Sequence, residues 1–446
     1  MTPLASRRRS TELGLGIIAV ILVIGGYVLV GLAENADLPP DLIAILVGLV
    51  GLFFLAHLAV RRFAPRADAT LLPLIVVLNG IGFIVIARLD RDLARVQSVW
   101  AAVGVAAFIG TLVLVRRVRV LERYRYTFLL VGIGFLLLPL LPGIGFSLNG
   151  ARLWAKLGPI TFQPGEAAKV LLVVFFAAYL VEKRELLSSG TLRVGRLRLP
   201  DPKHLGPLLL IWGFSLVVLV FETDLGSSLL FFAVFVGMLY VATQRFSYVA
   251  VGFGMFALGA LLAYQLFNHV QERVANWQDP WPAVGEGNSQ LVEALFGFGT
   301  GGFAGRGLGL GNPDRIPVVE TDFIFAAIGE ELGLLGTAAV LIGFLLLVGT
   351  GFRIAVQAQR PFSKLFATGL TTIIGMQTFV ILGGVTRLIP LTGITLPFVS
   401  YGGSSLVANF VIVALLLRIS DETAASAEEE LEQQIRQRSS VGMGAS

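Results

Sequence analysis

Long runs of apolar residues separated by short polar stretches repeat along the whole chain. Many runs approach or exceed the roughly 18–20 residues with which an α-helix crosses a bilayer. We therefore predict an all-α polytopic membrane protein with about twelve transmembrane helices. The predicted spans cover residues 13–32, 41–60, 70–88, 97–115, 126–142, 165–182, 205–221, 225–243, 247–267, 322–350, 364–385 and 397–418.

Composition excludes a soluble domain, because 55% of the residues are hydrophobic, only 14% are charged and the mean hydropathy is +0.82. The absence of cysteine excludes disulfides and thiol chemistry. Three scattered histidines are too few for a histidine metal site. No nucleotide-binding, dinucleotide-binding or protease motif is evident, which argues against an ATPase, a redox enzyme or a protease. The first span follows Arg7-Arg8-Arg9 like a signal peptide, but it is long and lacks a clear cleavage site, so we expect an anchor.

Lysine and arginine divide unevenly between the two sides of the predicted bundle. With the N-terminus in the cytoplasm, 24 of the 34 cations lie inside, nine lie outside, and Lys169 lies within a span. The positive-inside rule then predicts a plasma-membrane protein with both termini cytoplasmic and with a large extracytoplasmic loop, residues 268–321, between helices nine and ten. The +5 net charge thus reflects topology, and we expect no nucleic-acid partner.

Three regions follow from this reading. Residues 1–69 hold an N-terminal tail and two transmembrane helices, residues 70–420 hold a ten-helix core, and residues 421–446 form a charged cytoplasmic tail. The tail is partly helical in pattern, and a solvated tail is favoured over a partner helix.

Charged residues at membrane boundaries are the candidate functional residues, because a charge is energetically costly to keep at such a position. In the first cluster, Arg152 lies before a helix that Pro164 is suited to start. Glu166 and Lys169 are three residues apart, so they lie on one face and can pair. Glu166 could also simply complement the helix dipole. Lys169 points from within a span, which favours function.

Two further acids lie on the same side. Asp224 sits in a very short outer hairpin, where it either caps the next helix or faces an outer cavity. Asp322 lies where a glycine-rich loop, residues 299–311, and a polar stretch lead into an apolar helix that Thr321 could cap. The positive helix end would hold Asp322 ionised, as a general base requires. We expect the glycine loop to be a mobile cover, and Glu330 and Glu331 to have supporting roles.

The fourth cluster, residues 387–405, combines two prolines, three glycines and several hydroxyls. Such irregular backbone at membrane depth is tolerated only against protein or a wet cavity. Carriers break their helices in the same way, so this cluster alone does not separate a transporter from an enzyme.

The four clusters, in this order, resemble the motifs of the SEDS family (shape, elongation, division and sporulation), whose members include RodA and FtsW. The resemblance covers roughly residues 70–420. The matching stretches are Asn149-Gly-Ala-Arg152, Phe162-Gln163-Pro164-x-Glu166-x-x-Lys169, Asp224-Leu-Gly, Thr321-Asp322-Phe-Ile-Phe, Glu330-Glu331-Leu-Gly, Pro390-Leu-Thr-Gly-Ile and Leu396-Pro-Phe-x-Ser400-Tyr-Gly-Gly-Ser-Ser. The chain departs from the usual pattern at Gly165, at Glu222-Thr223 and at Arg387. Of these departures, Arg387 is the one expected to affect the shape of the cavity wall.

The resemblance implies a peptidoglycan glycosyltransferase that polymerises lipid II at the outer face of the plasma membrane, together with a class B penicillin-binding protein. Asp322 matches the family's catalytic aspartate, and we interpret it as the base for the acceptor sugar hydroxyl. Lys169 and Arg152 are candidates to meet the donor's pyrophosphate, where fixed cations stabilise a leaving anion.

The same resemblance suggests further site residues. Glu166 and Asp224 would orient Lys169 or, with Asp322, hold Mg²⁺ or Mn²⁺. Gln163, Ser400 and Ser404 complete the expected substrate site. No dedicated metal motif is present, and no cofactor is required by the pattern.

The two additional N-terminal helices look like the extension of some elongation-type members, which favours a RodA-like over an FtsW-like, division-type enzyme. A lipid II flippase or another transporter is the alternative from a different class, and a scaffold for division or elongation partners is a third. The charges gather on one side and not at mid-membrane, which favours the enzyme.

Overall fold

The computed structural model describes most of the 446-residue chain. It leaves out residues 1, 2, 36, 40, 149, 150, 159, 189–191, 195, 196, 200–208, 210–212, 214–224, 284–289 and 444–446. The predicted span at 205–221, like Asp224, therefore falls outside the described residues.

Long apolar helices dominate the structure, and ten of those described are long and apolar enough to cross a membrane. The polytopic all-helical membrane fold is confirmed, while the number of twelve spans stays a prediction. The ten are α1 (Pro3–Asn35), α2 (Leu42–Phe63), α3 (Leu71–Leu89), α4 (Arg91–Leu114), α7 (Pro164–Glu182), α10 (Leu225–Thr243), α11 (Phe246–Leu266), α14 (Ile324–Gln357), α15 (Pro361–Val385) and α16 (Gly403–Met443). A shorter apolar helix, α6 (Arg125–Leu137), continues into the 3₁₀ turn η1 (Leu138–Leu140).

Helix starts follow local sequence signals. The Asp90 side chain accepts hydrogen bonds from the backbone N–H groups of Asp92 and Leu93, which caps α4. Pro164 and Pro361 occupy the first positions of α7 and α15, where a missing N–H costs no intrahelical bond.

Small elements decorate both ends of the bundle, and the sequence did not predict them. Strands β1 (Gly145–Leu148), β2 (Ala151–Leu157) and β3 (Ile160–Phe162) form an antiparallel sheet in that order. Strands β4 (Leu192–Val194) and β5 (Leu197–Leu199) form a separate hairpin. The remaining short elements are α5 (Arg119–Arg123), α8 (Arg184–Ser188), α12 (Asn268–Gln278), η2 (Trp281–Ala283), α13 (Gln290–Gly301) and η3 (Pro313–Arg315).

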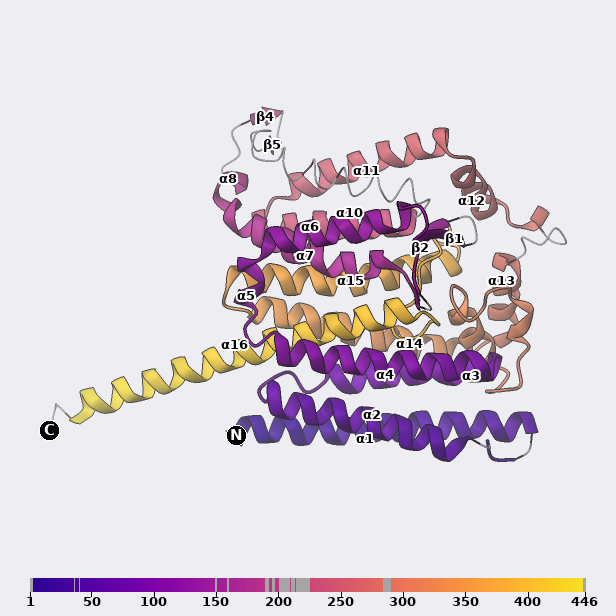
Figure 1. Ribbon diagram of the computed structural model, residues 1–446, viewed down its shortest axis with the longest axis horizontal. Helices are drawn as coiled ribbons and strands as arrows, with labels where there is room; N and C mark the ends of the chain where they lie inside the picture. Colours follow the sequence, from indigo (N-terminus) through magenta and orange to yellow (C-terminus); the bar gives the residue numbers. More distant parts are fainter. Residues whose placement is uncertain are drawn as a thin grey trace.

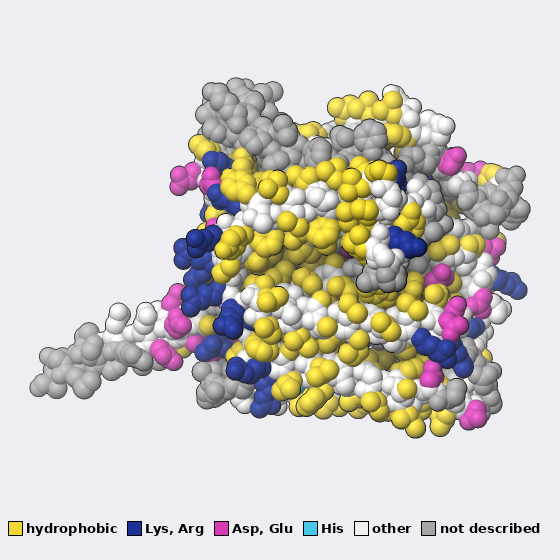
Figure 2. Space-filling model, in the orientation of Figure 1, with side chains coloured by type: hydrophobic (Ala, Val, Ile, Leu, Met, Phe, Trp, Pro, Cys, Tyr) yellow, Lys and Arg dark blue, Asp and Glu magenta, His cyan; other side chains and the backbone are white. Residues whose placement is uncertain are grey.

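The long helices run side by side, with α1 and α2 as an outer layer against α3 and α4 (Figure 1). Both ends of the chain lie at one end of the bundle, and β1, β2, α12 and α13 lie at the other. Lysine and arginine side chains gather at the end that holds the termini, and a broad hydrophobic band separates it from the opposite end (Figure 2). This is the surface distribution of a membrane-spanning bundle.

Burial separates inner from outer helices. The most apolar windows of α7 and α16 are each 78% buried, whereas that of α11 is only 11% buried. Helices α7, α15 and α16 therefore form the centre on which the other elements pack, and α11 presents its side chains to lipid.

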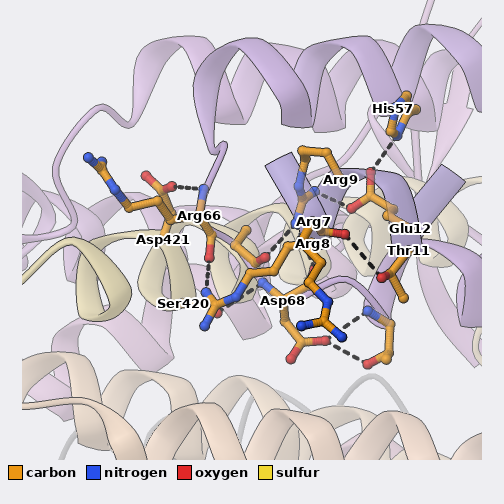
Figure 3. Close-up of polar contacts among 12 residues, drawn as sticks. Arg7, Arg8, Arg9, Thr11, Glu12, His57, Arg66, Asp68, Ser420 and Asp421 are labelled. Carbon is orange, nitrogen blue, oxygen red and sulfur yellow. Dashed lines mark hydrogen bonds and ion pairs between the residues drawn. The ribbon is translucent and has the colours of Figure 1, made fainter. Parts of the chain in front are cut away.

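A buried ionic cluster attaches the outer layer to the core (Figure 3). Arg9 and Glu12 of α1 form an ion pair, and the Arg9 guanidinium also donates to the Ala67 carbonyl between α2 and α3. The His57 Nδ1 lies 2.7 Å from Glu12 Oε1. Arg9 and Glu12 are 2% and 0% exposed, so their charges depend on each other for compensation.

The turn between α2 and α3 extends this cluster to the C-terminal helix. The Arg66 backbone N–H donates to Asp421 Oδ1 at 2.8 Å, and the Nε of the Arg66 side chain lies 2.8 Å from Glu428 Oε2. The Asp68 N–H donates to Ser420 Oγ at 3.1 Å. Helix α16 thus holds the N-terminal pair at the end of the bundle where both termini lie (Figure 3).

We predict that Glu12→Ala destabilises the protein by about 3–5 kcal/mol, because it leaves the Arg9 guanidinium buried without a counter-charge. The check is the thermal unfolding midpoint in detergent. Glu429→Ala, an exposed acid of α16, is the control and is expected to leave the midpoint unchanged. Equal midpoints for the two variants would contradict the role assigned to the cluster.

Candidate active site

The site is built around the stretch between α15 and α16, residues 388–402, which we call the irregular segment. It has no regular secondary structure, and its backbone takes positive φ at Gly393 (75°) and Phe398 (65°). A side chain at Gly82 of α3 would come within 2.2 Å of the Val399 carbonyl oxygen, so α3 and the segment touch backbone to backbone. Packing of this kind holds a non-helical stretch in one conformation.

Asp322 lies on a turn that the irregular segment holds in place. The Ser400 hydroxyl donates to the Thr321 carbonyl, and the Tyr401 N–H donates to the Glu320 carbonyl at 2.8 Å. The Ser400 hydroxyl also accepts from the Leu396 N–H at 2.9 Å, so it bonds to the backbone both as donor and as acceptor. The carboxylate of Asp322 is thereby placed by two hydrogen bonds to its immediate neighbours in the chain.

The predicted cap of the following helix is wrong. Helix α14 begins at Ile324 with Phe323 at its N-cap and no side-chain cap bond. Thr321 instead donates from its hydroxyl to the Val318 carbonyl at 3.3 Å. The reason is the tight turn there, in which Val318 has a φ of 56°, a conformation that β-branched residues rarely adopt. Asp322 therefore precedes the helix instead of lying in its first turn.

A cation that the sequence left unassigned borders the same glycine as Asp322. Arg273 of α12 donates from Nη1 to the Thr392 carbonyl at 3.1 Å. A Cβ at Gly393 would lie 3.7 Å from Asp322 Oδ2 and 4.0 Å from Arg273 Nη2, so both groups border the space over this glycine. A side chain at 393 would contact both of them.

Arg387, which the sequence suggested affects the shape of the cavity wall, is bonded to the end of α12. Its Nε donates to the Trp277 carbonyl at 2.8 Å, and its Nη2 donates to the Gln278 carbonyl at 2.6 Å. The Trp277 indole Nε1–H donates to the Arg387 carbonyl at 3.1 Å. Arg387 thus fastens the end of α12, and with it Arg273, to the irregular segment.

Lys169 and Glu166 form the predicted ion pair, with 2.7 Å between Nζ and Oε2. They are 3% and 8% exposed. Lys169 also donates to Gln377 Oε1 of α15 at 3.3 Å, and Gln377 Nε2 donates to the Thr395 carbonyl at 3.1 Å. The pair therefore reaches the irregular segment through Gln377, a residue that the sequence reading missed. A glutamine within an apolar span was the available signal.

The other predicted site residues are placed differently. The Gln163 N–H donates to Ser404 Oγ at 2.9 Å, which joins the start of α7 to the start of α16. Arg152 of β2 donates from Nε to the Pro139 carbonyl at 2.9 Å, at the end of α6. Asp224 is outside the described residues. Its near neighbour Gly226 packs on the segment, since a Cβ there would lie 2.9 Å from side-chain carbons of Thr392 and Ile394.

The glycine-rich loop is anchored, not a free cover. Glu330 Oε1 accepts from the Asn312 N–H at 2.9 Å, and Glu331 Oε2 accepts from the Gly309 N–H at 3.1 Å. The Nε of Arg88 lies 3.2 Å from Glu331 Oε1. The expectation of a mobile cover is wrong because these buried carboxylates need the loop's N–H groups as partners. Their predicted supporting role is confirmed.

The described residues do not gather a metal site. No group of three or more His, Cys, Asp or Glu that could hold an ion occurs among them. Glu166, one of the predicted ligands, is already compensated by Lys169. Asp224, another predicted ligand, lies outside the described residues, so the Mg²⁺ or Mn²⁺ suggested by the sequence stays a prediction. The chemistry below uses side chains alone.

We predict that Lys169→Met lowers stability by about 3–5 kcal/mol, because Glu166 is then buried without its partner. Adding Glu166→Gln is expected to recover most of this loss, which a double-mutant cycle of thermal midpoints measures. Asp92→Asn, which breaks an exposed pair with Arg95 of the same spacing, is the control and costs at most about 1 kcal/mol. A double variant as unstable as Lys169→Met would contradict the pairing argument.

Comparison with known proteins identifies a family to which this sequence is similar. The family model of the FtsW, RodA and SpoVE proteins, described as cell cycle protein, matches residues 67–425. The peptidoglycan glycosyltransferase RodA of Mycobacterium tuberculosis is 44% identical over 431 residues, covering 94% of this chain and 92% of the relative. The probable peptidoglycan glycosyltransferase FtsW of Geobacter sulfurreducens is 34% identical over 333 residues, covering 73% of this chain and 84% of the relative.

Solved structures agree with the sequence comparison. A chain of a peptidoglycan synthase complex that coordinates polymerisation and crosslinking aligns with a TM-score of 0.65 at 27% identity, covering 80% of this chain and 98% of that one. The rod shape determining protein RodA of Thermus thermophilus aligns with a TM-score of 0.58 at 27% identity, covering 79% and 96%. The chain belongs to the FtsW/RodA/SpoVE family, the SEDS proteins, and within it resembles RodA more than FtsW.

Proposed function

We propose that this protein polymerises lipid II into glycan strands at the outer face of the plasma membrane, with Asp322 as general base. The chain is a peptidoglycan glycosyltransferase of the RodA type, as its membership of the family and its 44% identity to enzymes of that name support. The observation that supports the assignment of the site is that the Asp322 carboxylate and the Arg273 guanidinium both border the space over Gly393 of the irregular segment.

The chemistry needs a base, a cation and fixed geometry. Asp322 takes the proton from the acceptor sugar hydroxyl while the oxygen of that hydroxyl bonds to the anomeric carbon of the donor. The bond between that carbon and the pyrophosphate oxygen breaks, and undecaprenyl pyrophosphate leaves with the electron pair. Arg273 is suited to stabilise the leaving anion, because it is already held by the Thr392 carbonyl and needs no reorganisation.

The other assigned residues act at the edge of this centre. Lys169 is buried and ion-paired with Glu166, so we propose that this pair holds the irregular segment through Gln377. When substrate enters, the Lys169 ammonium turns to the donor pyrophosphate. Arg152, Asp224 and Gln163 are proposed to contact the donor, as the family resemblance implies. Ser400 and Ser404 are proposed to serve the site by holding its backbone, which their hydrogen bonds support.

The orientation in the membrane is part of the proposal. The end of the bundle that holds both termini also gathers lysine and arginine side chains, so we place it in the cytoplasm (Figure 2). Asp322 and α12 then face the outer side. The likeness to a chain from a peptidoglycan synthase complex supports a transpeptidase partner, a class B penicillin-binding protein, with which the glycan strands are cross-linked.

We predict that Asp322→Ala lowers lipid II polymerisation by the purified protein and its partner by about 10²–10⁴-fold, the usual contribution of a general base. Glycan products resolved on a gel provide the measurement. Asp314→Ala is the matched control, since Asp314 is an acid of the same loop with a side chain that is 58% exposed, and it is expected to keep full activity. Undiminished polymerisation by Asp322→Ala would favour a scaffold or a transporter instead.

A further inference from the structure

The outer helix pair leaves a cavity against the core. The buried residues of α2 all lie in its second half, from Phe53 to Val60, which is the half near the ionic cluster of Arg9 and Glu12. Residues 42–52, the first half of α2, are half-buried or exposed, although α2 contacts both α3 and α4. Between the three helices lies a cavity of about 620 Å³, a size typical of small-molecule sites.

The walls of this cavity are mostly apolar and lie at membrane depth. Ile45 and Leu49 of α2 line it, as do Leu72 and Val76 of α3. Val105 of α4 and Phe410 of α16 line it as well. All of these residues belong to helices long and apolar enough to span the membrane. Hydrocarbon is the filling that such walls favour, since water would find few hydrogen-bonding partners there.

One end of the cavity is basic. Arg91 and Arg95, in the first two turns of α4, line it together with Asp41. The Asp41 carboxylate accepts a hydrogen bond from the Tyr27 hydroxyl at 2.6 Å. Arg95 pairs with Asp92 at 2.9 Å, but both side chains are largely exposed, at 74% and 87%, so the pair is weak and easily exchanged for another anion.

A buried amide lies two residues further into the membrane. Gln97 lines the cavity, is 1% exposed, and its Oε1 has no hydrogen-bond partner. A buried polar atom without a partner is costly, so it marks a place where a ligand would supply one. Because the two ends of a carboxamide are interchangeable by a half turn, Gln97 can accept from a hydroxyl or donate to an ester carbonyl.

These features define one kind of ligand: an anion at the membrane surface, a polar ester or hydroxyl region just below it, and hydrocarbon beneath. We propose that the cavity between α2, α3 and α4 binds an anionic glycerophospholipid, with its phosphate at Arg91 and Arg95, its glycerol ester region at Gln97 and an acyl chain along α2. The lipid fills the end of the outer pair that the ionic cluster does not hold (Figures 1 and 3). It therefore completes the attachment of α1 and α2 to the core.

Two glycines allow the cavity to be filled without disturbing the helices. Gly48 and Gly51 of α2 line it, and a Cβ at either would have no atom within 4 Å. Gly48→Phe should therefore occupy the acyl-chain space. Gly254→Phe is the matched control, because Gly254 is also a helix glycine with no atom within 4 Å of its Cβ, but it lies on the lipid-facing helix α11.

The experiment incubates the full-length protein with mixed micelles of dioleoyl phosphatidylglycerol or dioleoyl phosphatidylcholine and measures retained lipid by native mass spectrometry. The wild type and Gly254→Phe are expected to retain about one phosphatidylglycerol per chain, and Gly48→Phe is expected to retain at least tenfold less. Equal retention by Gly48→Phe and Gly254→Phe would overturn the proposal, as would wild-type preference for phosphatidylcholine.

A second pair of variants tests the headgroup end without filling the cavity. Arg91→Gln with Arg95→Gln should abolish the preference for phosphatidylglycerol, whereas Arg119→Gln, an exposed arginine at the other end of the bundle, should leave it unchanged. Gln97→Leu should weaken retention of either lipid several-fold. Unchanged retention in both variants, or a polyprenyl pyrophosphate as the molecule that copurifies with the wild type, would overturn the assignment.

Discussion

Backbone that leaves the helical conformation inside a membrane bundle has to find its hydrogen-bond partners within the protein, because lipid offers none. The irregular segment between α15 and α16 meets this constraint with side chains from α12 and α15 and with one of its own. Thr392, Thr395 and Leu396 bond to Arg273, Gln377 and Ser400, respectively. Each bond that satisfies the segment also fixes the residue that makes it. The site is therefore a consequence of how this stretch is kept folded.

Strain on both sides of the site fits the same picture. Val318, just before Asp322, and Phe398, just before Ser400, both have positive φ, and Ser400 joins the two turns through the Thr321 carbonyl. Such conformations persist only where the surroundings determine them fully, and they favour a catalytic group that is positioned before substrate arrives. The buried pair of Lys169 and Glu166 adds a second fixed point behind the segment, through Gln377.

The sequence predicts best those charged residues that lie at a depth where lipid disfavours an isolated charge. The pairing of Glu166 with Lys169 could be predicted, because isolated charges at such depth need a function or a partner. The same reasoning selected Asp322, whose role stays a prediction. Arg273 and Gln377 were missed, since their importance comes from contacts made 119 and 18 residues away along the chain. The strands β1–β3 carry no strong signal in so short a stretch.

The central proposal is that the Asp322 carboxylate acts on a bound substrate as a base. The most direct test compares Asp322→Asn with the wild type in one preparation, measuring both lipid II binding and glycan polymerisation. Asparagine has nearly the same shape but cannot take up the proton. We therefore predict retained binding with polymerisation reduced by about 10²-fold or more. Polymerisation at the wild-type rate, or a loss of activity that follows from lost binding alone, would contradict this role of Asp322.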